Sequence, residues 1–525
     1  MKIGSSLVRY SVDHPKTVTA IMIVLTLAIA VAAALPSLWP RTFVFMHGVE
    51  VDTDPENMLP HDEPVRVFHD RMKETLSLND MVVVGVVNPG AEQGVFNHLT
   101  LHRIYELTEY ARTLSWPDHD EPGDYAGVIE PDMIALSTVD NIEQGGLGTV
   151  KFEWLMSEPP LDNDAALAVR DKARDIPFLH GTLVSDKKGG KAVALYLPLS
   201  AKDQSYRIYS ALNERIPYIV RWGRVRQAWR SLEAESGDDA AWRELNRLGR
   251  LAAQQAESPE AFERAIRWLA DRSTNKAEDS FTLGVSDALV TDSIRSLEND
   301  WLERLDELRT ELDKKEKANA TDEELHRARL DLWLARIAAS EEIRRAMRQA
   351  AGQLKGIGGR LVDYRLASRR SLMIDPDADN PSLADRLLDD LKEFEASAAD
   401  ALGGGPLPET SIATTNDALG AAAEAEDYHI TGLPVAEDTF GVEMFKQMAM
   451  SAPLAMVVIF ILMYIFFRRV ILIVSPMIVA MVSVIITMAL LVVTGQTIHI
   501  MSSMIPIFIM PIAVLDAVHI LSEFF

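Results

Sequence analysis

The chain has 525 residues, with 52 lysines and arginines against 77 aspartates and glutamates, and a net charge of −25. This acidic balance argues against nucleic acid as a partner, because phosphate binding needs a basic face. The chain contains no cysteine, which excludes disulfides and cysteine–zinc sites. It is too long for one ordinary domain, and its charge is uneven, since residues 17–38 and 450–525 are nearly uncharged.

The first apolar stretch lies at residues 17–38, after a segment 1–16 that carries three basic residues. A membrane span needs about 20 apolar residues, so this stretch is long enough. A secretory signal peptide is the alternative, since small residues near 30–34 could form a cleavage site. The apolar run is long for a signal peptide and further spans follow, which favours an uncleaved span at 17–38.

Three more apolar stretches near the end of the chain predict spans at 451–467, 470–494 and 500–525. Arg468 and Arg469 separate the first two of these spans. Basic residues in short loops stay on the cytoplasmic side, which places this arginine pair and residues 1–16 in the cytoplasm. The segment 39–447 then lies on the far side of the membrane.

The outer segment 39–216 and its return at 426–447 show the pattern of an α+β domain. We predict strands and helices in the order strand 81–87, helix 95–114, strand 128–139, strand 192–199, helix 205–216 and strand 427–433. This order is βαβ followed by βαβ, the split ferredoxin-like arrangement. The predicted fold class is therefore an α-helical membrane protein with an α+β extracytoplasmic domain.

Residues 217–425 interrupt this domain as a large, highly charged helical insertion. Apolar residues recur at steps of three and four over 294–312 and again over 325–339, and a capping box at Thr321 opens the second stretch. This pattern predicts an antiparallel hairpin with a coiled-coil seam. The apolar stripe is most simply that seam, with a ligand groove as the alternative. The charged exterior is either a solvated face or a docking surface for a partner protein.

Asp516 and His519 lie well inside the last apolar stretch and share one helix face, being three residues apart. An ionisable residue in a span is expensive and is a functional hypothesis by default. Burial disfavours the charged carboxylate, so Asp516 could load a proton from the outer side and release it inside, with His519 as partner or shuttle. The alternative for Asp516 is a packing hydrogen bond to Ser483 or Thr487, and for His519 a packing or interfacial role.

Other candidate sites are weaker. Acidic and histidine residues between Asp52 and Asp70 could hold a cation, but their spacing fits no ligand template and a solvated acidic loop is the simpler interpretation. His98 and His102 lie four apart without the glutamate that a metalloprotease needs, and the chain has no Walker loop and no nucleophile elbow. We therefore predict no metal site, no cofactor and no enzymatic activity.

Four pieces of sequence, in their order relative to the spans, carry a resemblance to a known family. They read VDTDPENMLPHDEPVRVF after the first span, ALSTVDNIEQGGLG at 135–148, PFLHGTLVSDKKGGKAVALYLPL at 177–199 and ITGLPVAEDTFGVEMFKQMAMSAPLA at 430–455. This layout resembles the resistance–nodulation–division (RND) superfamily of proton-driven exporters, in the branch of mycobacterial large membrane proteins and hopanoid-type lipid exporters. The family's fourth span usually reads Gly-x-x-Asp with an aromatic neighbour. Here Ala513 replaces the glycine, Asp516 is the aspartate, and Ala517 replaces the aromatic residue.

The resemblance implies RND-type spans, a porter-like outer subdomain and a proton relay through Asp516 and His519. It implies a proton-motive-force-driven transporter that exports a hydrophobic or lipid-like substrate from a bacterial inner membrane, with the large domain in the periplasm. Family members carry two copies of this unit. We therefore expect a missing C-terminal half, or a half-transporter that pairs with a second copy.

The expected partners are the lipid bilayer, the hydrophobic substrate, the second half or copy, and a periplasmic protein at the helical hairpin. Two alternatives remain open at the level of sequence. One is a non-transporting membrane scaffold or lipid sensor whose hairpin docks a partner protein. The other is a membrane motor that assists protein export.

Overall fold

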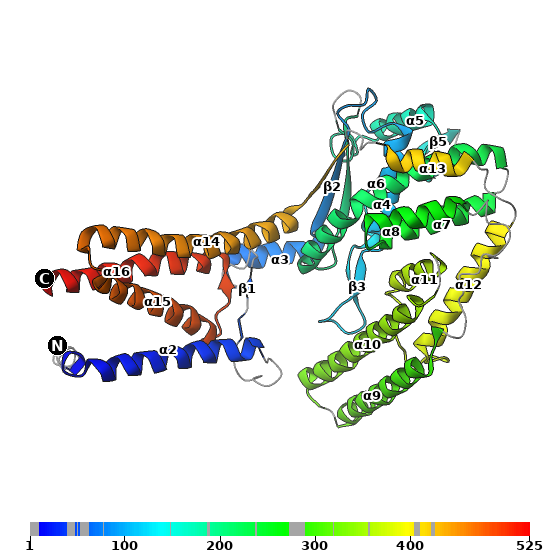
Figure 1. Cartoon of the computed structure of the whole chain (residues 1–525). Helices are drawn as coiled ribbons and strands as arrows, with labels where there is room; N and C mark the ends of the chain where they lie inside the picture. Colours follow the sequence, from blue (N-terminus) through cyan, green and yellow to red (C-terminus); the bar gives the residue numbers. More distant parts are fainter. Residues whose placement is uncertain are drawn as a thin grey trace. The chain divides into compact units, whose positions relative to one another are not determined.

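The computed structural model (Figure 1) describes residues 10–38, 48–49, 51–52, 62–76, 78–146, 149–185, 190–236, 239–271, 289–318, 320–354, 357–403, 410–421 and 426–524. The chain divides into two compact units. Unit 1 comprises Met1–Leu78 and Val435–Phe525, and unit 2 comprises Asn79–Pro434. The sequence also predicts a glycine-rich turn at 187–191 and a Gly/Pro-rich break at 403–406, and both lie largely outside the described residues.

Unit 1 contains the apolar helices that the sequence predicts as spans. They are α2 (Pro15–Leu38), α14 (Leu433–Phe467), α15 (Val470–Val493) and α16 (Ile505–Phe524), accompanied by the amphipathic α3 (Pro64–Leu76). Helix α14 begins well before the span predicted at 451–467, because the polar segment that precedes this span is also helical. Arg468 adopts a left-handed conformation with φ 51° and makes the tight turn between α14 and α15.

The C-terminal ends of α2 and α15 contact each other, which the sequence did not predict. Ala33 of α2 packs with Ala489 and Val492 of α15. The strand β1 (Val51–Asp52), which follows α2, pairs in parallel with β9 (Ile498–His499), which follows α15. The C-terminal ends of α2 and α15 therefore lie together at one end of unit 1.

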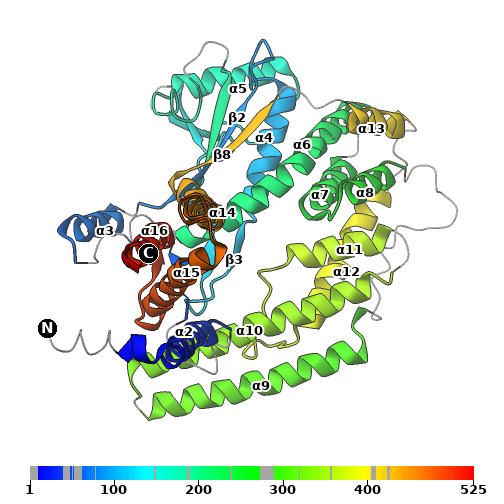
Figure 2. The same cartoon turned by 60° about the vertical axis from the view of Figure 1, so that its left-hand side comes forward.

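Unit 2 is built on a three-stranded sheet of β2 (Met81–Val87), β7 (Ala192–Pro198) and β8 (Asp427–Thr431), in the order β7-β2-β8. Both neighbours are antiparallel to β2, with Val84 opposite Leu195 on one side and Ile430 on the other. Strands β7 and β8 are therefore parallel to each other, with β2 between them, which is a split βαβ unit. Helices α4 (His98–Ala111) and α6 (Ser205–Ser236) pack against each other beside this sheet (Figure 2).

The strand predicted at 128–139 is wrong. This segment forms a 3-10 turn at Glu130–Asp132 and meets β7 and the residue after it through isolated bridges, Ile134 with Tyr196 and Val128 with Leu199. Pro131 explains the difference, since proline lacks the N–H group that a strand ladder needs. The segment still occupies the edge of the sheet next to β7. Between these strands the chain also forms β3 (Ser115–Pro117), β4 (Tyr125–Gly127), β5 (Asp140–Gly146), β6 (Thr149–Trp154) and α5 (Asn163–Asp175).

The predicted helical insertion is confirmed over its described residues. Helix α6 runs on far beyond the predicted end at 216, and the chain then forms α7 (Asp239–Gln255), α8 (Pro259–Asp271), α9 (Asp292–Lys317), α10 (Asp322–Ala351), α11 (Ile357–Ser368), α12 (Leu383–Gly403) and α13 (Thr410–Gly420). Its core contains the fully buried rings of Trp222 and Trp229, which meet edge to face at 5.3 Å. The insertion therefore has a hydrophobic core of its own.

The predicted hairpin is formed by α9 and α10, and its capping box is present at Thr321 and Glu324. Ile294 and Leu305 of α9 are buried, as the seam pattern predicts. Arg329 pairs with Glu316 across the connection at 2.9 Å. Helix α10 differs from a simple coiled-coil partner, because Trp333 and Ile337 are buried in a second cluster with Met373.

Close packing around Trp222 makes a first prediction. A Cβ atom at Gly249 of α7 would lie 2.0 Å from the Trp222 ring, which is buried and cannot move aside. We expect Gly249→Ala to lower the free energy of unfolding of unit 2 by about 1–3 kcal/mol, in the range of other overpacked cores. Gly420→Ala, where the new methyl group meets no atom within 4 Å, is the matched control. Thermal unfolding of the purified chain compares the two variants, and equal stabilities would contradict the packing shown.

A buried charge network joins α4 to the insertion. The Glu106 side chain is 1 % exposed and accepts hydrogen bonds from Arg226 Nη1 at 2.6 Å and from Arg250 Nε at 2.7 Å. Burial lowers the pKa of Arg226, whereas for Arg250 the Glu106 carboxylate outweighs the effect of burial and raises the pKa. Glu106 therefore supplies the negative charge that both arginines need.

His102, on the same helix, makes the stability of unit 2 depend on pH. Burial, together with the positive charge of Arg226, lowers the pKa of His102 from 6.5 to about 3. Below pH 6.5 the unfolded chain binds a proton at His102 and the folded chain does not. The free energy of unfolding of unit 2 therefore falls by about 2 kcal/mol between pH 7 and pH 5. We expect His102→Leu to remove this part of the pH dependence in thermal unfolding at the two pH values. His326→Gln, an exposed histidine on α10, should keep the wild-type dependence. An unchanged dependence in His102→Leu would contradict this prediction.

Candidate functional site

Helix α16 carries the residues that the sequence singles out, and one of its faces is packed. Met510 and Val514 are buried together with Met463 of α14 and with Ile473 and Ala480 of α15. Ala513 and Val518 pack against the same cluster. This face of α16 is therefore occupied by the neighbouring candidate spans.

Asp516 and His519 lie on the other face of α16. Both side chains are exposed within unit 1, and they share this face with exposed Phe508, Ile512, Leu515 and Ile520. Three residues along a helix put the two side chains about 5–6 Å apart at Cβ. The structure thus brings the carboxylate and the imidazole onto one face of an apolar helix, away from α14 and α15.

The packing role considered for Asp516 finds no support in the geometry of α15. The Ser483 hydroxyl donates to the Val479 carbonyl, and the Thr487 hydroxyl donates to the Ser483 carbonyl, each at 2.8 Å within its own helix. Among the described residues, the Asp516 carboxylate has no hydrogen-bond or ion-pair partner. Asp516 is therefore not used to hold α15 and α16 together.

The position of Asp516 decides what it can do chemically. It follows Ile505, where α16 begins, by about 17 Å at 1.5 Å per residue, which is about half the thickness of a 30 Å hydrocarbon core. A charged side chain at such a depth costs about 2.5–3.5 kcal/mol if it faces lipid. A carboxyl group that binds and releases a proton, next to an imidazole that can do the same, is suited to proton transfer.

A metal ion is the next ligand to consider for the described residues. Over the part of the chain that the structure describes, no three histidine, aspartate or glutamate side chains are placed to hold a metal ion. Residues 53–61 of the acidic segment between Asp52 and Asp70, which the sequence offers as a weak cation site, lie outside that part. His98 instead contacts Asn163 Oδ1 through Nδ1 at 2.6 Å, while His102 is buried.

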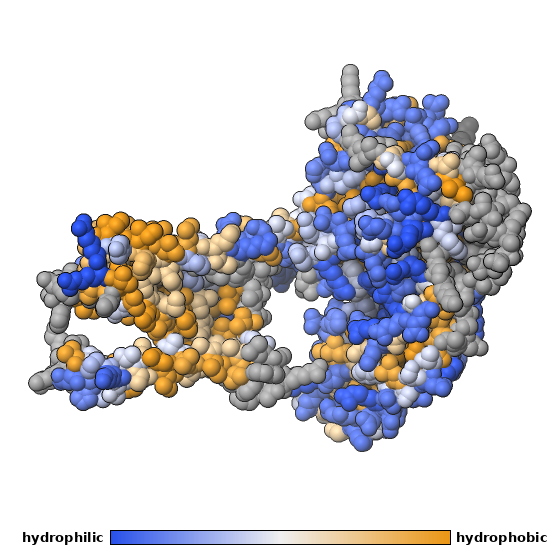
Figure 3. Space-filling model, in the orientation of Figure 1, coloured by the Kyte–Doolittle hydropathy of each residue, from blue (hydrophilic) through white to orange (hydrophobic). Residues whose placement is uncertain are grey.

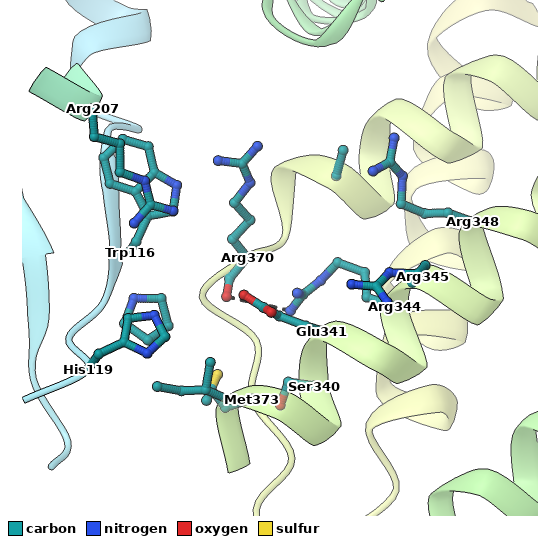
Figure 4. Close-up of a pocket in the computed structure, with 13 residues that line it drawn as sticks. Trp116, His119, Arg207, Ser340, Glu341, Arg344, Arg345, Arg348, Arg370 and Met373 are labelled. Atoms are coloured by element: carbon teal, nitrogen blue, oxygen red, sulfur yellow. Dashed lines mark hydrogen bonds between the residues drawn. The ribbon is translucent and has the colours of Figure 1, made fainter. Parts of the chain in front are cut away.

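Sequence reasoning missed a second set of charged residues, in unit 2. Arginines from α6, from α10 and from the segment after α11 line one pocket, namely Arg207, Arg344, Arg345, Arg348 and Arg370 (Figure 4). They are up to 163 positions apart in the chain (207 to 370), and no motif joins them. The only signal in the sequence is the density of arginine near the end of α10, which is also usual for a solvated helix.

The hydrophobic helices of unit 1 give the chain the features of a membrane protein. Three helices are long and apolar enough to cross a membrane, over Pro15–Ser37, Leu433–Phe467 and Leu472–Val493, and a shorter apolar helix covers Ile505–Ile520. Figure 3 shows hydrophobic residues over the outer surface of these helices, whereas the visible surface of unit 2 is mainly hydrophilic. Comparisons with models of protein families, with curated proteins and with solved structures find no match.

Proposed function

We propose that the chain is part of a proton-driven RND-type transporter that exports a hydrophobic or lipid-like molecule. The observation that carries this proposal is the pair Asp516 and His519 on the unpacked face of α16. Ionisable residues are costly in a membrane span, so a role in proton transfer accounts for this pair best. The class of cargo rests on the resemblance to the branch of lipid exporters.

The arrangement of unit 1 supports this proposal. The joined ends of α2 and α15 agree with spans that place residues 1–16 and Arg468 on the cytoplasmic side. We place the chain in a bacterial inner membrane with unit 2 in the periplasm. Protons moving inward down a potential of about 100 mV would each supply about 2.3 kcal/mol for the transport cycle.

The exposed face of α16 also suggests which kind of partner the chain has. Because a carboxylate facing lipid is unfavourable, we propose that another membrane helix covers Asp516 and His519 in the working protein. This helix would belong to a C-terminal half or to a second copy of the chain. The proton path would then lie between two faces, of which this chain supplies one.

A scaffold that docks a partner protein is the second candidate function. It is favoured by the hairpin of α9 and α10, whose exposed surface carries ion pairs such as Arg329 with Glu316 and Lys315 with Glu311. A scaffold has no need of a titratable pair in α16, so the two functions make different predictions.

The experiment that separates them measures transport directly. Proteoliposomes containing the full protein are loaded with a fluorescently labelled phospholipid, and its appearance at an external acceptor is followed with and without an imposed proton gradient. A transporter gives movement that requires the gradient and stops when a protonophore is added. A scaffold gives the rate of protein-free liposomes under both conditions, and this result would overturn the proposal.

A further inference from the structure

A pocket of about 380 Å³ lies within unit 2, between the β3–β4 hairpin and the helical insertion. The hairpin is held against the insertion by two contacts: Tyr125 donates from its hydroxyl to the Ser371 carbonyl at 3.0 Å, and Trp333 of α10 donates from its indole to the Asp118 carbonyl. The Tyr125 and Trp333 rings also meet edge to face. Both walls of the pocket are therefore fixed relative to each other.

Arginine side chains enter this pocket from both walls. In Figure 4, Arg207 comes with Trp116 from one side, Arg344, Arg345 and Arg348 come from α10 on the other side, and Arg370 lies between them. The Arg207 guanidinium stacks on the Trp116 ring at 3.9 Å, which holds it in place.

Very little negative charge balances these arginines. Arg348 forms a bidentate pair with Asp363, at 2.6 and 3.2 Å, but the other four form no ion pair with a carboxylate among the described residues. Among the described residues that line the pocket, Glu341 is the only acidic one. This positive pocket occurs in a chain whose net charge is −25, so it does not follow from the average composition.

Arg344 is the buried member of the group. Arg344 is 7 % exposed, and its Nη2 donates a hydrogen bond to the Leu372 carbonyl at 2.8 Å. Its Nε–H group is buried and has no hydrogen-bond partner among the described residues. Burial and the nearby positive charge of Arg370 lower the pKa of Arg344 to about 10, although Glu341 acts in the opposite direction. A bound anion would offset the repulsion between Arg344 and Arg370 and would accept a hydrogen bond from Arg344 Nε.

We propose that this pocket binds a phosphate group, carried either by a lipid headgroup or by a soluble phosphate monoester. Guanidinium groups recognise phosphate through paired N–H donors, and a phosphate dianion has enough oxygen atoms to meet several arginines at once. A carboxylate has only two oxygen atoms and therefore contacts fewer arginines. Trp116, Ile337 and Met373 form an apolar part of the lining that can hold the group attached to the phosphate.

This site is independent of the proposed proton path. All its residues belong to unit 2, and phosphate binding requires no change at Asp516 or His519. The two proposals can therefore fail separately.

Binding to the purified full protein in a non-ionic detergent tests the site. The probes are inorganic phosphate and dihexanoyl phosphatidic acid, measured by isothermal titration calorimetry at constant ionic strength, with dihexanoyl phosphatidylcholine and citrate for comparison. We expect phosphate or phosphatidic acid to bind, and the double variant Arg207→Gln/Arg370→Gln to weaken binding at least about tenfold, because each charge-assisted hydrogen bond contributes about one such factor. Both arginines are exposed at the pocket, so the variant should fold.

The double variant Arg304→Gln/Arg327→Gln removes the same charge from exposed positions on the α9–α10 hairpin, outside the pocket, and should bind as the wild type does. Tighter binding of phosphatidic acid than of phosphate identifies a lipid headgroup, and equal binding identifies a soluble phosphate. The proposal is overturned if neither probe binds, if citrate binds and phosphate does not, or if both double variants lose binding equally. Should the first double variant unfold, Arg345→Gln, exposed at the same pocket, gives the same test by itself.

Discussion

Replacement of Asp516 by asparagine is expected to abolish transport of the labelled phospholipid, with a loss of at least about a hundredfold, the size typical of a lost proton-transfer group. Asparagine has nearly the same shape as aspartate but cannot take up and release a proton. Because Asp516 lies on the unpacked face of α16, the change leaves the contacts of Met510 and Val514 with α14 and α15 intact. The variant should therefore reach the membrane in normal amounts.

Two companion variants make this prediction specific. Asp516→Glu keeps a titratable carboxyl group and should retain part of the activity. His519→Gln tests whether the imidazole shares the work, and a rate between those of the wild type and Asp516→Asn is expected. Full activity of Asp516→Asn in the same vesicles would show that protons do not pass through this residue.

The largest expected effect on stability is at Glu106. We expect Glu106→Gln to lower the free energy of unfolding of unit 2 by about 3–5 kcal/mol, because removing one partner of a buried ion pair leaves the other charge uncompensated. Here Arg226 loses its carboxylate, and Arg250 keeps only Glu109, whose Oε2 lies 3.5 Å from its Nη1. The loss would also loosen the insertion from α4, since both arginines belong to the insertion's helices α6 and α7.

Tryptophan fluorescence during denaturation measures this effect, because eight of the nine tryptophans lie between residues 79 and 434. Glu311→Gln is the matched control, since Glu311 pairs with Lys315 on the exposed side of α9. Exposed pairs of this kind contribute about 0.3–0.5 kcal/mol. A Glu106 variant as stable as the Glu311 variant would mean that the network around Glu106 adds little to folding.

Local patterns predicted much of the fold. The run of valines over Met81–Val87 predicts strand β2, and the capping box at Thr321 predicts the start of the second helix of the α9–α10 hairpin. The segment 128–139 was misassigned for a local reason as well, since its apolar residues suggest a strand and Pro131 prevents one. The length of α6 was missed because Pro217 suggests an end, yet the helix continues through it.

The Asp516–His519 pair and the arginine pocket differ in how much of each could be predicted from the sequence. The pairing of Asp516 and His519 follows from a spacing of three residues, but the face of α16 that packs against α14 and α15 depends on tertiary contacts of Val514 and Met510. The arginine pocket could not be predicted, because it depends on how the β3–β4 hairpin docks on α10. Such docking rests on contacts such as that of Tyr125 with Ser371, which lie 246 residues apart.

The protonation of Asp516 itself is the most direct test of the proton-relay account. Infrared difference spectra of the membrane-embedded protein, recorded between acidic and neutral pH, detect the carbonyl stretch of a protonated carboxyl group. The account predicts a band that appears with acid in the wild type, is absent in Asp516→Asn, and shifts in His519→Gln. Identical spectra for the wild type and Asp516→Asn would contradict the claim that Asp516 carries protons through this protein.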